Sequence, residues 1–188
     1  MPQRQVLLID ACVLINLLAT EEIRAVLEYA AQKSMICTAV KNESLYLRIE
    51  DTPDEKKLID LRSLIEDGTL SLCEIETPAE EQLYVNFSAL LDDGEAMSLA
   101  ICLARNWHPA TDEKKARRLY LADAKYPDYL VSTSQLVREW AEVKKVSPDY
   151  LRLVLLRIER RAHYSPPAWD TNQDWWALSS AEAAPLAE

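Results

Sequence analysis

The sequence predicts an α/β protein, a three-layer α/β/α sandwich around a mostly parallel central sheet of about five strands. Short apolar runs, each the length of a buried strand, alternate with longer segments whose apolar residues recur at helical spacing. Such alternation joins parallel strands through right-handed crossovers and places helices on both faces of the sheet. With 188 residues and 49 % hydrophobic composition, the chain can bury one core.

The first strand is predicted at residues 6–9, where four apolar residues stand in a row before Asp10. Apolar residues then recur at helical spacing over 13–18 and 23–30. Further strands are predicted at 35–38, 70–75, 107–111 and 129–132. Helices are predicted at 40–49, 58–65, 78–91, 92–103, 113–122, 134–143 and 148–162. Gly68 ends the second of these helices, and Pro78 opens the third.

Two regions are predicted along the chain. Residues 1–164 form the α/β domain, and residues 165–188 form a tail that contains prolines and tryptophans. We expect this tail to lack regular structure and to pack on the body of the domain, with packing on a partner as the alternative.

The composition narrows the class of protein. The chain has 21 basic and 31 acidic residues, a net charge of −10, so its overall field does not attract nucleic acid. A metal site built from carboxylates would account for part of that negative charge. Only two glycines occur, which excludes a glycine-rich phosphate loop. No apolar run approaches a membrane span, and residues 1–10 lack a signal-peptide core, so we expect a soluble, cytoplasmic protein with no membrane partner.

The four cysteines are Cys12, Cys37, Cys73 and Cys102. They are widely spaced, without a CxxC pair, and each stands in an apolar stretch. We therefore predict buried thiols and neither a zinc site nor a disulfide framework.

Four acidic residues stand at positions where a parallel sheet collects ligands. Asp10 and Asp112 directly follow predicted strands, Glu43 lies on the helix predicted at 40–49, and Glu95 lies in the first turn of the helix at 92–103. Ligands bind beyond the carboxyl ends of the strands in such sheets, and hard divalent cations prefer oxygen ligands. The alternative is that Asp10, Glu95 and Asp112 only cap helices, and that Glu43 is a solvated residue.

Four segments resemble the motifs of the PIN-domain family, in the order and spacing of that family. They are LIDACVLINLL at 8–18, VKNE at 40–43, DGEAMSLA at 93–100 and ATDEKKAR at 110–117. The third and fourth are similar to signatures of one branch, which contains toxin-type ribonucleases. The resemblance covers about residues 5–162. It implies a PIN-like fold and a metal-dependent endoribonuclease that hydrolyses RNA phosphodiesters.

The resemblance also implies roles for single residues. Asp10, Glu43, Glu95 and Asp112 would be the catalytic carboxylates and would hold Mg²⁺ or Mn²⁺. Glu113 stands where the branch usually has a second Asp and is a further candidate ligand. Many relatives are the toxins of toxin–antitoxin pairs, so the implied partners are an RNA substrate, an antitoxin protein and a second copy of the chain.

Further residues are expected to support the site. Asn16 would orient Asp10, or serve as a structural amide in the core. Thr111, Ser132 and Thr133 offer hydroxyl groups near the acids, although Ser132 and Thr133 are also suited to capping the next helix. A compact basic cluster is predicted to hold substrate phosphates, unless it is only a solvated helix face. It consists of Lys114, Lys115, Arg117 and Arg118.

One feature departs from the family pattern. Pro109 lies in the strand predicted at 107–111, where the family has an apolar central strand, so this strand is expected to be short. This departure and the acidic net charge leave a second hypothesis, a catalytically inactive PIN-like module that binds a protein or RNA. A phosphoacceptor receiver domain is disfavoured, because the third strand ends without Asp and residues 129–133 contain no Lys.

Overall fold

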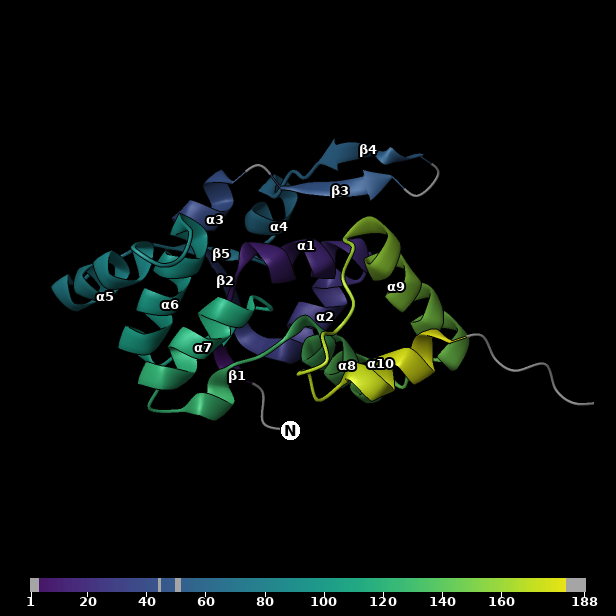
Figure 1. The fold of residues 1–188 in the computed structure, drawn as a ribbon. Coiled ribbons are helices and arrows are strands. Elements are labelled where there is room, and N and C mark those ends of the chain that lie inside the picture. Colours follow the sequence, from purple (N-terminus) through teal and green to yellow (C-terminus); the bar gives the residue numbers. More distant parts are fainter. Residues whose placement is uncertain (1–3, 44, 50–51, 182–188) are drawn as a thin grey trace, which may run out of the picture.

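A sheet of parallel strands lies at the centre of the molecule, with helices on both of its faces (Figure 1). The computed structural model describes residues 4–43, 45–49 and 52–181. In the described residues the sheet has the strand order β5-β2-β1-β6. These strands are β1 (Arg4–Ile9), β2 (Ala31–Cys37), β5 (Ser71–Cys73) and β6 (His108–Ala110). The predicted fold class is confirmed.

The helices divide between the two faces. Figure 1 shows α3, α5, α6 and α7 on one side of the sheet, and α1, α2, α8 and α9 on the other. Their bounds are α1 (Ala11–Ala19), α2 (Ile23–Ala30), α3 (Thr38–Asn42), α4 (Arg62–Glu66), α5 (Pro78–Ser88), α6 (Asp93–Arg105), α7 (Lys114–Asp123), α8 (Thr133–Lys144), α9 (Pro148–Arg161) and α10 (Gln173–Ser180). Among the described residues, every helix is too short or too polar to cross a lipid bilayer.

Strand β1 runs through the middle of the core. Leu7, Leu8 and Ile9 are fully buried, because β1 pairs with β2 on one side and β6 on the other and is covered by helices on both faces. The strand ends at Asp10, whose Oδ1 atom accepts a hydrogen bond of 2.8 Å from the backbone N–H of Ala11. Asp10 thus caps α1 and stands at the carboxyl edge of the sheet.

The segment after α3 differs from the prediction. Helix α3 ends at Asn42, and the helix expected at 40–49 gives way to β3 (Tyr46–Ile49), which pairs antiparallel with β4 (Thr52–Leu58). Leu45 and Leu47 are buried while Tyr46 between them is exposed, which is the alternation of a strand. The expected helix at 58–65 was wrong in its first residues, since only α4 is helical there.

The fifth predicted strand, at 129–132, is reduced to a single bridge between Val131 and Ala110. A short 3₁₀ helix, η1 (Pro127–Tyr129), precedes the bridge and prevents a longer pairing. In β6, the carbonyl oxygen of Pro109 accepts from Val131 N at 2.9 Å. The missing N–H of this proline therefore points away from β1, which explains how β6 tolerates it.

The C-terminal segment (residues 163–181) packs on the body, as predicted for the tail at 165–188, whose residues 182–188 lie outside the described part of the chain. Trp176 is 2 % exposed, and Asp170 is buried against α8. The expectation that the whole tail lacks regular structure was wrong, because α10 forms there and packs along α9. The prediction of buried cysteines is confirmed for Cys37, Cys73 and Cys102, whereas Cys12 is partly exposed; all four are free thiols.

Candidate functional site

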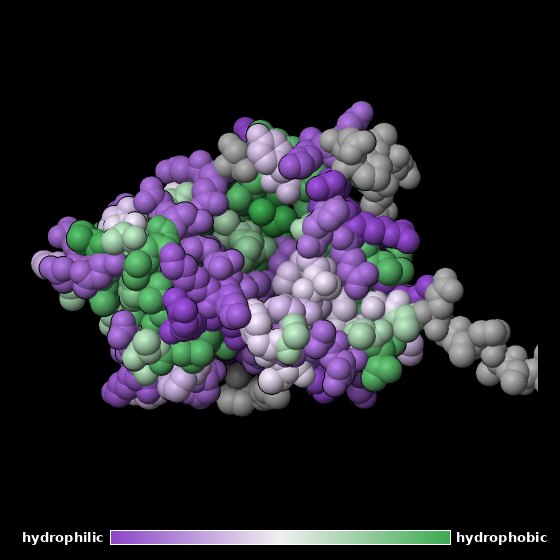
Figure 2. Space-filling model, in the orientation of Figure 1, coloured by the Kyte–Doolittle hydropathy of each residue, from purple (hydrophilic) through white to green (hydrophobic). Residues whose placement is uncertain are grey.

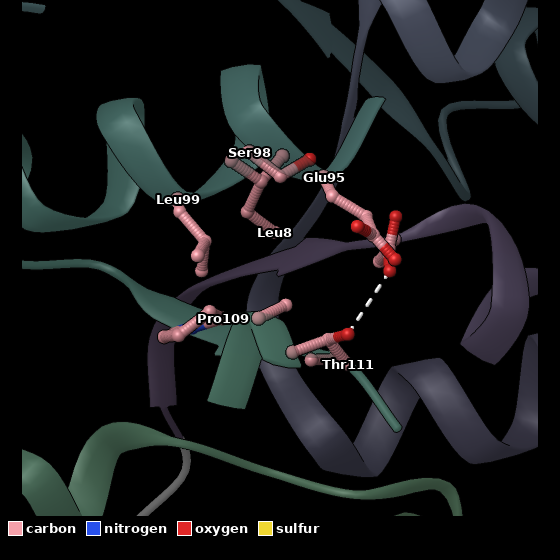
Figure 3. A pocket seen from close by; sticks show the side chains of 9 residues that line it. Leu8, Glu95, Ser98, Leu99, Pro109 and Thr111 are labelled. Carbon is pink, nitrogen blue, oxygen red and sulfur yellow. Dashed lines mark hydrogen bonds between the residues drawn. The ribbon is translucent and has the colours of Figure 1, made fainter. Parts of the chain in front are cut away.

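Asp10 and Glu95 line one small cavity at the carboxyl edge of the sheet (Figure 3). The cavity has a volume of about 10 Å³, and Ser98 and Thr111 also line it. Figure 3 shows the Glu95 side chain reaching from α6 toward the carboxylate that accepts the hydrogen bond of Thr111, which is that of Asp10. Two acids that are distant in sequence therefore converge, as the sequence predicted.

Asp10 is held firmly in this position. It is only 4 % exposed, and its Oδ2 atom accepts hydrogen bonds from Thr111 Oγ1 at 3.0 Å and from Cys12 Sγ at 3.3 Å. Burial raises the pKa of Asp10 above its ordinary value, although these donors oppose the effect. The side chain is thus a fixed carboxylate, and its partners among the described residues include no Lys or Arg.

Glu95 enters the site from the first turn of α6. Its backbone N–H donates to Asp92 Oδ1 at 3.0 Å, so Asp92 caps the helix and fixes the position of the Glu95 backbone. Burial, and then the charges of Asp92 and Asp10, raise the pKa of Glu95 to about 7. The shift indicates that the carboxylates repel one another across the cavity.

Glu43 is the third acid of this group, although it does not lie on a helix as predicted. It follows the last residue of α3, and its carboxylate lies against the backbone of Gly94 at the start of α6. Burial, and then the charges of Asp92 and Asp10, raise the pKa of Glu43 to about 7. Asp10, Glu43 and Glu95 together are called the acidic pocket below.

Asp112 stands apart from the acidic pocket in its bonding. Its Oδ1 atom accepts from Thr133 N at 3.0 Å and from the Tyr164 hydroxyl at 3.3 Å. Its Oδ2 atom accepts from Asn16 Nδ2 at 3.0 Å and from Thr133 Oγ1 at 2.5 Å. Burial raises the pKa of Asp112, and the hydrogen bonds from Thr133, the charge of Arg117 and the hydrogen bond from Asn16 oppose this increase. The carboxylate therefore has the full set of hydrogen bonds that it can ordinarily accept.

The residues predicted to support the site divide into those that bind an acid and those that cap a helix. Asn16 is buried and donates to Asp112 and to Thr133, so of the two predicted alternatives the structure supports a buried amide, and the acid that it orients is Asp112 and not Asp10. Ser132 caps α8 by accepting from Gln135 N at 3.3 Å, which matches the alternative of a simple cap.

Glu113 caps α7, since its Oε1 atom accepts from Lys115 N at 3.3 Å. It is exposed, and its charge is one of those that raise the pKa of Glu95. Glu113 is therefore near enough to the acidic pocket to act on it electrostatically.

The predicted basic cluster is not one surface. Arg117 Nη1 donates to the backbone carbonyls of Thr111 at 2.8 Å and Val131 at 3.1 Å, and its guanidinium lies over the ring of Trp169. Lys115 Nζ donates to the backbone carbonyl of Leu90. Lys114, Lys115 and Arg118 are exposed at the surface of α7, whereas Arg117 is partly buried. Arg117 thus supports the backbone on which Asp112 stands.

The acidic pocket offers the right donors for Mg²⁺ or Mn²⁺, because hard cations bind carboxylate oxygens. The crowded charges around Glu43 and Glu95 also favour a cation there. Within residues 4–43, 45–49 and 52–181, however, no three Asp, Glu, His or Cys side chains stand close enough to hold a metal as placed. Glu43 is exposed and Glu95 partly exposed.

Three neighbours of these acids were not predicted from the sequence as residues of the site. Cys12 was treated only as a buried thiol, although its place two residues after Asp10 is a usable signal. Asp92 stands next to the recognised DGEA segment and both caps α6 and repels Glu43. Tyr164 gave no signal, because it lies in the C-terminal segment, far from every motif.

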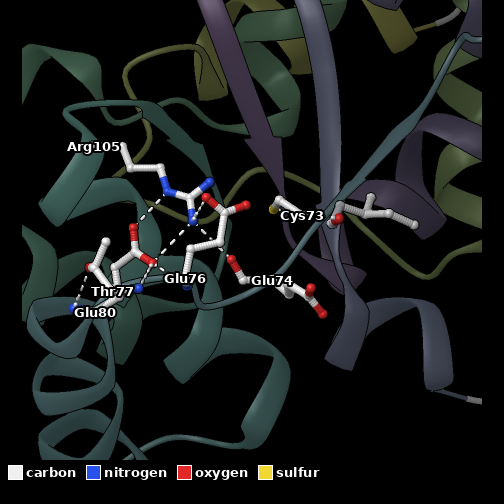
Figure 4. Close-up of polar contacts among 7 residues, drawn as sticks. Cys73, Glu74, Glu76, Thr77, Glu80 and Arg105 are labelled. Carbon is white, nitrogen blue, oxygen red and sulfur yellow. Dashed lines mark hydrogen bonds and ion pairs between the residues drawn. The ribbon is translucent and has the colours of Figure 1, made fainter.

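A second group of carboxylates lies at the other end of α6 (Figure 4). Arg105 Nε donates to Glu80 Oε1 at 2.6 Å, and Arg105 Nη2 donates to Glu80 Oε2 at 3.0 Å. Glu80 also accepts from the backbone N–H groups of Glu76 and Thr77, at 2.7 and 3.2 Å. Because Arg105 neutralises these acids, they form a structural tether and not a metal site.

The surface beside the site is hollowed beneath the β3–β4 hairpin. Figure 2 shows apolar side chains gathered in this hollow, which is bordered by hydrophilic residues. The groove has a volume of about 520 Å³. Leu18, Leu47, Ile49, Leu58 and Ile59 are among its lining residues.

No family model, curated protein or solved structure matches this chain.

Proposed function

We propose that the protein is a metal-dependent endoribonuclease of PIN type, with its chemistry at the acidic pocket and Asp112 beside it. The observation that carries the proposal is that Asp10 and Glu95 line one cavity at the carboxyl edge of the sheet, while the Glu43 carboxylate lies against the start of α6, the helix that carries Glu95. They come from three separate segments of the chain, and the charge of Asp10 raises the pKa values of both glutamates. The motif resemblance supplies the substrate class.

A buried carboxylate without a cationic partner costs free energy, and natural proteins retain such groups chiefly where they serve a function. Asp10 is buried, and the described contacts give it a thiol, a hydroxyl and an N–H but no Lys or Arg. Arg105 shows the contrast, because it neutralises Glu80 at the other end of α6.

Mg²⁺ or Mn²⁺ bound by Asp10, Glu43 and Glu95 would lower the pKa of a water and stabilise charge on a phosphodiester. The chain's own residues prepare the place. Thr111 fixes the rotamer of Asp10, and Asp112 adds fixed negative charge behind it. Burial, and then the charges of Asp10 and Asp112, raise the pKa of the Cys12 thiol. Cys12 therefore stays neutral and is no nucleophile.

The substrate must reach an acidic protein. Lys114 and Arg118 are exposed on α7, which starts directly after Glu113 at the carboxyl edge of the sheet. We assign to these two side chains the contact with RNA phosphates, since Arg117 and Lys115 are engaged with backbone carbonyls.

The test is Mn²⁺-dependent cleavage of single-stranded RNA by the purified full chain. We expect Asp10→Asn and Glu95→Gln each to lower cleavage by at least about 100-fold, because each removes a charged oxygen ligand. Glu81→Gln is the matched control: it makes the same chemical change on the exposed surface of α5 and should cleave like the wild type. Equal cleavage by wild type and Asp10→Asn would refute the proposal.

The second candidate is an inactive PIN-like module that binds a protein or RNA. The placement of the acids favours this inactive module, because among the described residues no three Asp, Glu, His or Cys side chains lie close enough to hold a metal ion. Titration calorimetry with Mn²⁺ separates the two. Binding that Asp10→Asn abolishes supports the nuclease, whereas no binding, together with RNA retention and no cleavage, supports the module.

A further inference from the structure

The C-terminal segment brings one side chain to the acids at the carboxyl edge of the sheet. His163, directly after α9, has a positive φ of 54°, so the chain turns sharply where it leaves the helix. The next residue is Tyr164, which is partly buried, and its hydroxyl donates to Asp112 Oδ1 at 3.3 Å. This is a contact between the last part of the described chain and the end of β6.

Tyr164 completes the hydrogen bonding of Asp112. The other three hydrogen bonds come from Asn16 and from the backbone and hydroxyl of Thr133. Because the Tyr164 bond is one of only two to Oδ1, its loss would leave that oxygen with Thr133 N alone and would permit the carboxylate to rotate.

The C-terminal segment is anchored by contacts that do not depend on the Tyr164 hydroxyl. Asp170 accepts from Ser134 Oγ at 2.8 Å, and Trp176 Nε1 donates to Glu159 Oε1 at 2.8 Å. The ring of Tyr164 itself packs edge-on against Trp176, with 5.6 Å between centroids. A phenylalanine at 164 would keep this packing and remove the hydroxyl, which donates to Asp112 and also interacts with the backbone N–H of Ser134.

We infer that Tyr164 is a positioning residue of the proposed nuclease: its hydroxyl fixes the Asp112 carboxylate, so that the C-terminal segment is part of the functional site. The effect on the metal rests on the proposed function. The fixing of Asp112 is a property of the metal-free protein and can be measured without it. Asp112 stands beside the proposed ligands, so the change in its position should act on the metal indirectly, with an effect of about 10-fold on metal affinity, the size typical of residues that support a metal site.

The test compares Tyr164→Phe with Tyr150→Phe in the full chain. Tyr150 is the matched control, since its hydroxyl contacts Glu22 at the exposed surface. The first measurement is hydrogen exchange of backbone amides in metal-free protein. We expect faster exchange at Thr133, whose N–H donates to Asp112, in Tyr164→Phe only. The amide of Leu136, which donates to Ser132 O in the same helix, should be unchanged.

The second measurement is the dissociation constant of Mn²⁺ alone, by titration calorimetry. We expect it to be about 10-fold weaker in Tyr164→Phe and unchanged in Tyr150→Phe. Unchanged exchange at Thr133, or equal loss of protection at Thr133 and Leu136, overturns the inference, and so does tighter Mn²⁺ binding. If exchange at Thr133 responds but the wild type binds no Mn²⁺, the positioning of Asp112 is supported and the proposed function fails.

Discussion

The carboxylate of Glu43 lies against the backbone of Gly94, where a side chain would collide with it. A Cβ atom built on Gly94 overlaps with Glu43 Oε1 and stands 3.1 Å from Val40 Cγ2. The absence of a side chain at position 94 therefore allows the end of α3 to bring its acid over the start of α6.

Gly94→Ala should damage the acidic pocket while sparing the fold. The new methyl group displaces the flexible end of Glu43, and the free energy of unfolding should change by less than about 1 kcal/mol, because alanine favours the helix. We expect Mn²⁺ affinity, measured by calorimetry, to fall about 10-fold.

A double-mutant cycle controls this prediction. In a Glu43→Ala background the carboxylate is already absent, so Gly94→Ala should cause no further loss of Mn²⁺ affinity. An equal loss in both backgrounds would show that Gly94 does not act through Glu43.

Thr111→Val should loosen Asp10 without changing the shape of the core. The Thr111 hydroxyl donates to Asp10 Oδ2 at 3.0 Å and accepts from Glu113 N at 3.2 Å. Its removal should lower the free energy of unfolding by about 1 kcal/mol, measured by denaturant titration, and weaken Mn²⁺ binding about 10-fold. Thr111→Ser keeps the hydroxyl and should keep most of the affinity; a serine variant as weak as the valine variant would exclude this role.

The metal-free protein should lose stability as the pH rises from about 4.5 to about 7. Burial and neighbouring charges raise the pKa values of Glu43 and Glu95 to about 7 in the folded protein, above the ordinary value of 4.5. The folded state therefore holds protons that the unfolded chain releases in this range, and the free energy of unfolding falls. Glu95→Gln should fall less steeply in denaturant titrations at several pH values; identical slopes would contradict the prediction.

Glu80 should act in the opposite direction and at lower pH. The hydrogen bond from Arg105 lowers the pKa of Glu80 from 4.5 to about 2, and the carboxylate is 1 % exposed. Its stabilising effect is complete above about pH 4.5 and is lost as the pH falls toward 2. At pH 6, Glu80→Gln should lower the free energy of unfolding by about 3 kcal/mol.

Glu76→Gln is the control for that ion pair. Glu76 Oε2 lies 3.5 Å from Arg105 Nη2, but its side chain is 63 % exposed, so its loss should cost less than about 1 kcal/mol. Similar costs for the two variants would show that burial does not strengthen the Glu80 pair.

The fold class was predictable because its signals are local. The unbroken apolar run at the end of β1 and the helical spacing after it need no knowledge of distant contacts. The β3–β4 hairpin was missed because Leu45 and Ile49 are spaced four apart, which suits a helix, while the burial of Leu45 and Leu47 follows the period of a strand. Over so few residues the two periods give the same apolar pattern.

The site was predictable only in part, for a related reason. Asp10 and Glu95 follow from the rule that ligands collect at the carboxyl edge of a parallel sheet, and the structure places both there. That Asn16 serves Asp112 depends on where α1 lies relative to the end of β6, and such a contact leaves no trace in sequence spacing. The hydrogen bonds from Arg117 to backbone carbonyls likewise cannot be predicted from a run of basic residues in the sequence.

The hydrogen bonds to Asp112 have a consequence for when the site becomes complete during translation. Its carboxylate is bound by residues 16, 133 and 164, so a nascent chain still lacking its last helices holds that acid without its full support. Asp10 in turn has no Thr111 partner until β6 has been made and has paired with β1. If the pocket cuts RNA, its full activity must wait until residues 111, 133 and 164 have been synthesised and have bonded to Asp10 and Asp112.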